Sequence, residues 1–135
     1  QMSPDFVPVK SADAWQLSNP PILALAPIRV SLRIFDEVGI DRLRTKSLKL
    51  TGYLRRLLDE IGSEALEIIT PRDTDQRGCQ LSILAHRDPE GLHKRLQAAD
   101  VICDFRRPNV IRIAPVPLYN SFEDCFRFAE VLRTV

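Results

Sequence analysis

The residues most suited to chemistry lie in the segment 109–121, NVIRIAPVPLYNS, where a single arginine interrupts an apolar strand pattern. Arg112 has isoleucines on both sides, and the chain then passes two prolines toward a predicted helix cap. A guanidinium group is planar and permanently charged, so it can bind a carboxylate or a phosphate through two parallel hydrogen bonds. Arg112 is therefore a candidate anion-binding residue, and the alternative is an edge-strand arginine that faces water.

The elements that would position Arg112 can be predicted from the spacing of apolar residues. Apolar residues three to four apart predict helices near residues 22–39, 41–62, 88–100 and 121–132. Runs rich in β-branched residues predict strands over residues 66–70, 79–85, 101–105 and 110–114. This order predicts an α/β fold with a small, mostly antiparallel sheet of about four strands, covered by helices on one side.

Capping residues predict where the helices begin. Ser18 or Asn19 is expected to cap the first helix, because the two prolines that follow need no backbone donor in a first turn. The later helix starts are expected at Asp41, at Asp88-Pro89-Glu90, and at Asn120 or Ser121 with Glu123 or Asp124 completing a capping box.

Each helix is expected to bury one apolar face. The first helix would bury Ile22, Leu25, Ile28, Leu32 and Phe35, with a kink at Pro27, and the last would bury Phe122, Cys125, Phe126, Ala129 and Leu132. The basic face of the second helix is expected to be solvated surface. Gly52 in that helix is expected to let another helix or strand approach closely, because a glycine there otherwise lowers helix stability.

Composition excludes several classes of function. A chain of 135 residues with 44% hydrophobic and 27% charged residues is typical of a soluble domain with one core. A net charge of +1 with scattered arginines argues against a nucleic-acid or anionic-membrane partner, and no apolar run approaches the length of a membrane span. The first residues lack the pattern of a secretory signal, so we expect a cytoplasmic protein. Three well-separated cysteines, Cys79, Cys103 and Cys125, are expected to be buried or half-buried free thiols.

Self-contained catalytic motifs are missing from the sequence. There is no glycine-rich phosphate loop, no G-x-S-x-G motif and no H-E-x-x-H motif. His86 and His93 are expected at the surface, and the cysteine spacing fits no metal site. The sequence therefore predicts no catalytic residue and no metal in this chain.

Longer segments carry a resemblance to a known family. The segments QLSNPPIL (16–23), LTGYL (50–54), QRGCQL (76–81) and IRIAPVPLYNSF (111–122) together closely resemble the carboxyl-terminal part of kynureninases. The resemblance runs in order from about Phe6 to the end of the chain, although Pro27 departs from the family pattern. Kynureninases are pyridoxal-phosphate enzymes of the aspartate-aminotransferase-like fold, also called fold type I.

The resemblance implies that residues 1–135 form a single small C-terminal domain with a linking segment at 1–18. In the family, the large domain that precedes this part supplies the lysine that holds pyridoxal phosphate. The lysines of this chain, Lys10, Lys46, Lys49 and Lys94, lie in other contexts. We therefore expect the chain alone to be inactive, and the partners implied are the missing large domain, a second copy in a homodimer and a small-molecule substrate.

Matching positions imply binding roles for three residues. Arg112 falls on the arginine that binds the α-carboxylate of the substrate, Asn19 on a position that contacts the cofactor phosphate, and Ser18 on one that faces the substrate's aromatic ring. For Ser18 and Asn19 the alternative is helix capping, and both roles are compatible. Trp15 is interpreted as a packing residue, and Tyr119 and Asn120 as packing and capping residues close to Arg112.

The implied reaction is hydrolysis of L-kynurenine or 3-hydroxykynurenine to anthranilate or 3-hydroxyanthranilate and L-alanine, a step of tryptophan catabolism that leads to NAD biosynthesis. Two alternatives stay open. The chain could be a stand-alone module without catalytic activity, or it could be the small domain of another fold-type-I pyridoxal enzyme, such as a cysteine desulfurase.

Overall fold

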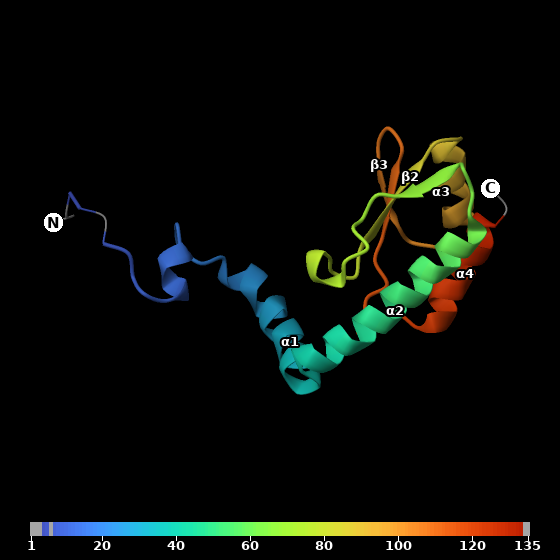
Figure 1. The fold of residues 1–135 in the computed structure, drawn as a ribbon. Coiled ribbons are helices and arrows are strands. Elements are labelled where there is room, and N and C mark those ends of the chain that lie inside the picture. Colours follow the sequence, from blue (N-terminus) through green and yellow to red (C-terminus); the bar gives the residue numbers. More distant parts are fainter. Residues whose placement is uncertain (1–3, 6, 134–135) are drawn as a thin grey trace. The chain divides into compact units, whose positions relative to one another are not determined.

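The computed structural model describes residues 4–5 and 7–133 and divides into two compact units, Gln1–Gly39 and Ile40–Val135 (Figure 1). Part of the expected linking segment 1–18 and Phe6, where the family resemblance begins, lie outside the described residues. The first unit contains a short 3-10 helix and one α-helix, and the second contains a sheet and three α-helices.

In the first unit, the helix α1 (Ile22–Val38) follows a 3-10 helix over Ala12–Trp15. The residue before α1 is Pro21, and no side chain caps the helix. The prediction that Ser18 or Asn19 caps it is therefore wrong. Pro21 disfavours a helical conformation at Pro20, so the helix begins only at position 22, which leaves Ser18 and Asn19 too far back along the chain to reach its first amides.

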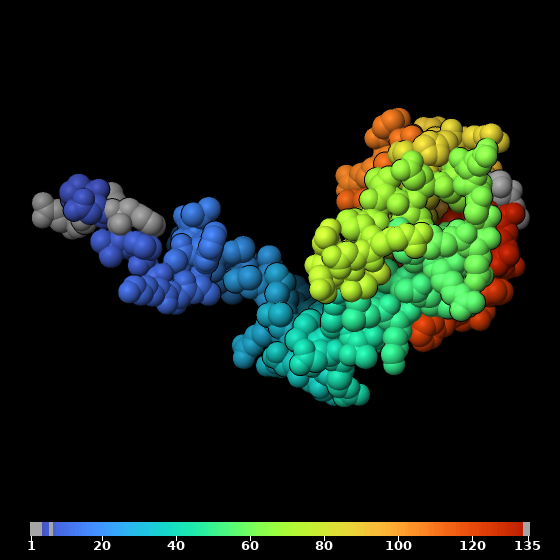
Figure 2. All heavy atoms as spheres, in the orientation of Figure 1, coloured from blue at the N-terminus to red at the C-terminus, as the bar shows by residue number. Residues whose placement is uncertain are grey.

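The apolar residues of α1 are not buried within this unit. None of its residues is buried, and eight large apolar side chains are 40–91% exposed: Ile22, Leu23, Leu25, Ile28, Val30, Leu32, Ile34 and Phe35. On the face seen in Figure 2, no other part of the unit covers this helix. Trp15 is 87% exposed as well, so it does not pack against the described residues and the expectation that it is a packing residue is wrong. Pro27 lies inside the helix as expected, and the kink stays a prediction.

The second unit contains a four-stranded antiparallel sheet in the order β1-β2-β4-β3. Its strands are β1 (Leu66–Ile68), β2 (Leu81–Ala85), β3 (Asp104–Arg106) and β4 (Val110–Ile113). All four are shorter than the runs that predicted them, but the predicted pairing of the first two strands is confirmed. β4 lies inside the sheet between β2 and β3, so both of its neighbours can place side chains beside Arg112.

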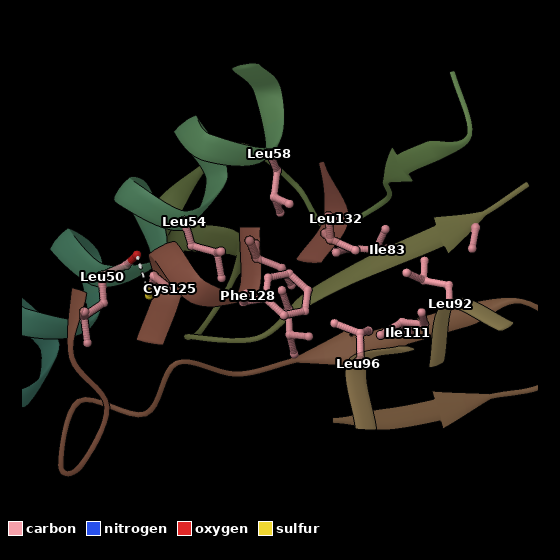
Figure 3. Close-up of a cluster of buried hydrophobic side chains, with 13 residues drawn as sticks. Leu50, Leu54, Leu58, Ile83, Leu92, Leu96, Ile111, Cys125, Phe128 and Leu132 are labelled. Carbon is pink, nitrogen blue, oxygen red and sulfur yellow. Dashed lines mark hydrogen bonds between the residues drawn. The ribbon is translucent and has the colours of Figure 1, made fainter. Parts of the chain in front are cut away.

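Three helices cover one face of the sheet: α2 (Ile40–Ile61), α3 (Pro89–Ala98) and α4 (Phe122–Leu132). In the close-up of Figure 3, side chains from all three helices converge on Ile83 and Ile111 of the sheet, with Phe128 among them. In Figure 1, α2 and α4 run side by side, in agreement with their close packing. The predicted α/β fold, a small antiparallel sheet covered by helices on one side, is confirmed.

Local capping decides where two of these helices begin. The Asp88 carboxylate accepts from the backbone N–H of Gly91 at 3.1 Å at the start of α3. Ser121 and Asp124 form a capping box at the start of α4, which confirms that prediction. Asp41 lies in the first turn of α2 instead of preceding it, so its prediction as a cap is wrong.

Other packing predictions need correction. Phe122 and Phe126 of α4 are exposed while Phe128 is buried, so the buried face is rotated toward Phe128. A Cβ atom at Gly52 would meet nothing within 4 Å, so no described element approaches it. Arg55, on the basic face of α2, is only 9% exposed and donates to the carbonyl oxygen of Thr70 at 2.8 Å. This arginine therefore ties the loop after β1 to α2 instead of facing solvent.

Candidate functional site

Arg112 projects from the face of the sheet that the helices do not cover. Along β4, Ile111 and Ile113 are buried against the helices, and Val110 and Arg112 alternate with them and are only partly buried. The strand pairing places Ser82 of β2 on one side of Arg112 and Asp104 of β3 on the other. Alternation along a central strand thus holds the guanidinium group on the open side of the sheet, on a backbone fixed by the core beneath it.

Asp104 is the direct partner of Arg112. The Nε–H of Arg112 donates to Oδ2 of Asp104 at 2.6 Å, and its Nη2 donates to the same oxygen. Arg106, two residues further along β3, donates its own Nε–H to that oxygen at 2.8 Å. The Arg112 and Asp104 side chains are 34% and 45% exposed, so this cluster of three charged groups is accessible to a ligand.

The bonds to Asp104 leave one edge of the Arg112 guanidinium available. An arginine has five N–H donors in a fixed plane, and Nε and Nη2 together form one of its edges. Among the described residues, no group is bonded to Nη1 of Arg112. The edge formed by Nη1 and Nη2 can therefore donate two parallel hydrogen bonds to a carboxylate ligand.

The two arginines also fix the charge state of Asp104. Hydrogen bonds from Arg106 and Arg112 lower the pKa of the Asp104 carboxyl below its ordinary value. Asp104 is therefore ionised at neutral pH and remains an acceptor. The pairing of Asp104 with Arg112 depends on strand register, so residue types alone do not reveal the role of Asp104. The signal that could have found it is the Asp-x-Arg spacing, which places Asp104 and Arg106 on the same face of a strand.

The loop after β4 is fixed by its own hydrogen bonds. Oδ1 of Asn120 accepts a hydrogen bond from the backbone N–H of Val116 at 2.8 Å. The backbone N–H of Asn120 in turn donates to the carbonyl oxygen of Val116 at 2.9 Å. Lys46 of α2 donates to the carbonyl oxygen of Pro117 at 2.7 Å. Asn120 thus stabilises the loop, and Ser121 rather than Asn120 caps α4. Tyr119 is exposed and does not pack as expected.

A groove of about 520 Å³ lies on the helix side of this loop. Tyr119, Asn120 and Phe128 are among the residues that line it, and neither Arg112 nor Asp104 is. The groove is therefore separate from the arginine cluster and adds nothing to its anion binding.

Ser18 and Asn19 belong to the first unit, and both are exposed. Ser18 accepts a hydrogen bond on its backbone carbonyl from Nε2 of Gln16 at 3.0 Å. Because neither side chain caps α1, both stay available to a ligand near the start of that helix. The binding roles of Ser18 and Asn19 stay predictions.

The two histidines have structural partners, and the three cysteines are free thiols that are buried or half-buried. His86 lies 3.2 Å from a carboxylate oxygen of Glu67, and the ring of His93 stacks on Phe105 with centroids 5.2 Å apart. Cys125 is buried and Cys79 and Cys103 are half-buried, which confirms the predicted free thiols. Within residues 4–5 and 7–133, no His, Cys, Asp or Glu side chains form a group of three or more that could hold a metal, and no helix is long and apolar enough to cross a membrane.

Comparison with known proteins assigns the chain to a family. The kynureninase C-terminal domain family matches residues 43–132. The kynureninase of Myxococcus xanthus is 54% identical over 133 residues, which cover 98% of this chain and 31% of that protein. The kynureninases of Koribacter versatilis and Salinispora tropica are each 49% identical and cover 96% and 98% of this chain.

The chain thus spans about a third of the length of the curated relatives that it matches. The family match covers both strands of the arginine cluster and the loop that follows them. The chain belongs to the kynureninase family.

Proposed function

We propose that the protein containing this chain is a hydrolase that cleaves the Cβ–Cγ bond of L-kynurenine or 3-hydroxykynurenine with water, giving L-alanine and an anthranilate. Family membership supports this reaction over that of a cysteine desulfurase. The observation that carries the proposal is the available Nη1–Nη2 edge of Arg112 on the uncovered face of the sheet. A stand-alone module stays the alternative that the experiment below tests.

Arg112 would bind the α-carboxylate of the amino-acid substrate. Two parallel hydrogen bonds from one planar group fix both the position and the rotation of a carboxylate. With the carboxylate fixed, the remaining substituents of Cα, including the side chain that is cleaved, have a defined direction. A guanidinium group carries a permanent positive charge, so the contribution of Arg112 is orientation and charge and not proton transfer.

Pyridoxal phosphate is the cofactor proposed for this reaction, and it would supply the electron sink that cleavage of a carbon–carbon bond needs. Asn19 would contact its phosphate group. Two features fit an anion there: Asn19 is exposed and does not cap a helix, and no side chain caps the amino terminus of α1. Lys46 has a structural role, because its amino group donates to the carbonyl oxygen of Pro117. The lysine that binds the cofactor is proposed to come from outside this chain.

Ser18 would face the aromatic ring of the substrate. Its exposed hydroxyl, which caps no helix, could distinguish a ring that carries a 3-hydroxyl group from one that does not. A cytoplasmic homodimer, in which the first two-thirds of each protein complete the active site, is part of the same proposal. Light scattering of the purified full-length protein tests the dimer.

The direct test is an assay of the full-length protein with pyridoxal phosphate and L-kynurenine. Equal release of anthranilate and L-alanine is expected, with a severe loss in an Arg112→Gln variant. Arg127→Gln is the matched control, because Arg127 is an exposed arginine whose partner is Glu123 of the same helix. A wild-type protein that releases neither product from kynurenine nor from 3-hydroxykynurenine would contradict the proposal and favour the stand-alone module.

A further inference from the structure

Asp104 is held opposite Arg112 by the pairing of β3 with β4. Register partners on adjacent antiparallel strands project from the same face of the sheet, so the two side chains meet without help from any loop. Because β4 is a central strand packed on the helical core, the backbone beneath Arg112 is fixed. The orientation of its long side chain then depends on what holds the guanidinium group.

The bonding pattern shows which part of the guanidinium is held. Nε and Nη2 of Arg112 both donate to a single oxygen of Asp104, so the carboxylate occupies the Nε–Nη2 edge of the plane. Holding that edge fixes the rotation of the whole plane, because the five donors are rigidly connected. The opposite Nη1–Nη2 edge is the one that remains for a ligand.

The charge balance of the cluster fits a monovalent carboxylate ligand. Arg112 and Arg106 both donate to Asp104, and two arginines with one aspartate leave a formal charge of +1. Asp104 therefore orients Arg112 without cancelling the positive charge of the cluster. One further carboxylate group would neutralise it.

We propose that Asp104 is a positioning residue, which holds the guanidinium of Arg112 so that its Nη1–Nη2 edge is presented to the α-carboxylate of an amino-acid ligand. The inference rests on the proposed function, in which Arg112 binds that carboxylate. An arginine side chain that is free to rotate loses conformational entropy when it binds. Because Asp104 already restricts the Arg112 side chain before the ligand binds, less entropy is lost on binding. Removing the Asp104 carboxylate therefore weakens carboxylate binding, although the charge of Arg112 is unchanged.

The test uses the full-length protein loaded with pyridoxal phosphate and two ligands that differ only in the carboxylate. L-Homophenylalanine has the carbon skeleton of kynurenine without the ketone and so is not hydrolysed, and 3-phenylpropylamine is the same molecule without its carboxylate. Calorimetric titration gives both dissociation constants, and their ratio measures the preference for a carboxylate. Asp104→Ala is expected to reduce this ratio about tenfold. Asp104→Asn, which keeps a hydrogen-bond acceptor, is expected to retain part of it.

Two further variants separate the possible outcomes. Glu90→Gln is the matched control, because Glu90 is a carboxylate paired with Arg107 on the same domain, and its ratio should equal that of the wild type. Arg112→Gln should abolish the preference. If Arg112→Gln abolishes it while Asp104→Ala and Asp104→Asn leave it unchanged, the role of Asp104 is refuted and the proposed function stands. If Arg112→Gln keeps the preference, or the wild type has none, both proposals are refuted. Should Asp104→Ala not fold, Asp104→Asn decides alone.

Discussion

Replacing Arg112 with lysine in the full-length protein is expected to impair catalysis while leaving the fold intact. Lysine keeps the positive charge but has a single nitrogen, so it cannot form two parallel hydrogen bonds to a carboxylate while it also contacts Asp104. A charge-assisted hydrogen bond is worth about 1.5 to 3 kcal/mol. Loss of one such bond predicts that kcat/KM falls roughly tenfold to more than a hundredfold.

The same substitution should have little effect on stability. The Arg112 and Asp104 side chains are 34% and 45% exposed, and ion pairs of that exposure contribute only about 0 to 1 kcal/mol to folding. Arg112 also lies on the sheet face that the helical core does not use, so the substitution opens no cavity. The melting temperature should therefore change by no more than about 4 °C.

The assay is steady-state release of anthranilate from L-kynurenine, with thermal unfolding of the same samples. The reasoning predicts a large loss of kcat/KM together with a nearly unchanged melting temperature. Full activity in the lysine variant would show that Arg112 does not form two parallel hydrogen bonds to the substrate carboxylate. A loss of activity that follows unfolding would make Arg112 a structural residue.

Three further predictions concern the fold. Gly52→Ala should stabilise the protein by about 0.5 to 1 kcal/mol in urea unfolding, because a Cβ there meets open space; destabilisation would reveal a contact from the rest of the protein. Ser121→Ala should cost about 1 kcal/mol of stability. Since Ser121 lowers the pKa of Asp124 below its ordinary 3.8, this cost should shrink as the pH falls below 3.8, and an equal cost at all pH values would contradict the capping box. Burial raises the pKa of Cys125 to about 11, so iodoacetamide at pH 8 should label it more slowly than Cys79 in peptide mapping, and equal rates would refute its burial.

The features that were predicted correctly depend on residues close together in the sequence. The capping box at Ser121 and Asp124 spans four residues, and its hydrogen bonds form within one turn. The helix start at Asp88 is equally local. Each of these can be predicted without knowledge of what packs against the segment.

The incorrect helix faces have a different cause. Both Phe126 and Phe128 continue the three-to-four spacing of apolar residues in α4, so periodicity alone does not choose between them. The sheet and α2 decide the choice, and Phe128 is the residue they bury. In α1 the residues expected to be buried are exposed, because periodicity does not say which segment would cover them and none of the described residues of this unit does.

The pairing of Asp104 with Arg112 could not be predicted, for a related reason. Its contact with Arg112 requires the register of β3 on β4, and a shift of one residue would turn one of the two side chains to the other face. The predicted third strand, over residues 101–105, also began earlier than β3 does. Residue types can thus identify the arginine, whereas its partner is identified only once the strands are paired.

The most direct test of the central claim is a crystal structure of the full-length protein with pyridoxal phosphate and L-homophenylalanine bound. If Arg112 binds the substrate carboxylate, both carboxylate oxygens of the ligand lie about 2.7 to 2.9 Å from Nη1 and Nη2 of Arg112. Nε of Arg112 should still donate to Asp104 in that complex. A ligand carboxylate bound to any other residue, with Arg112 pointing away from it, would contradict the account.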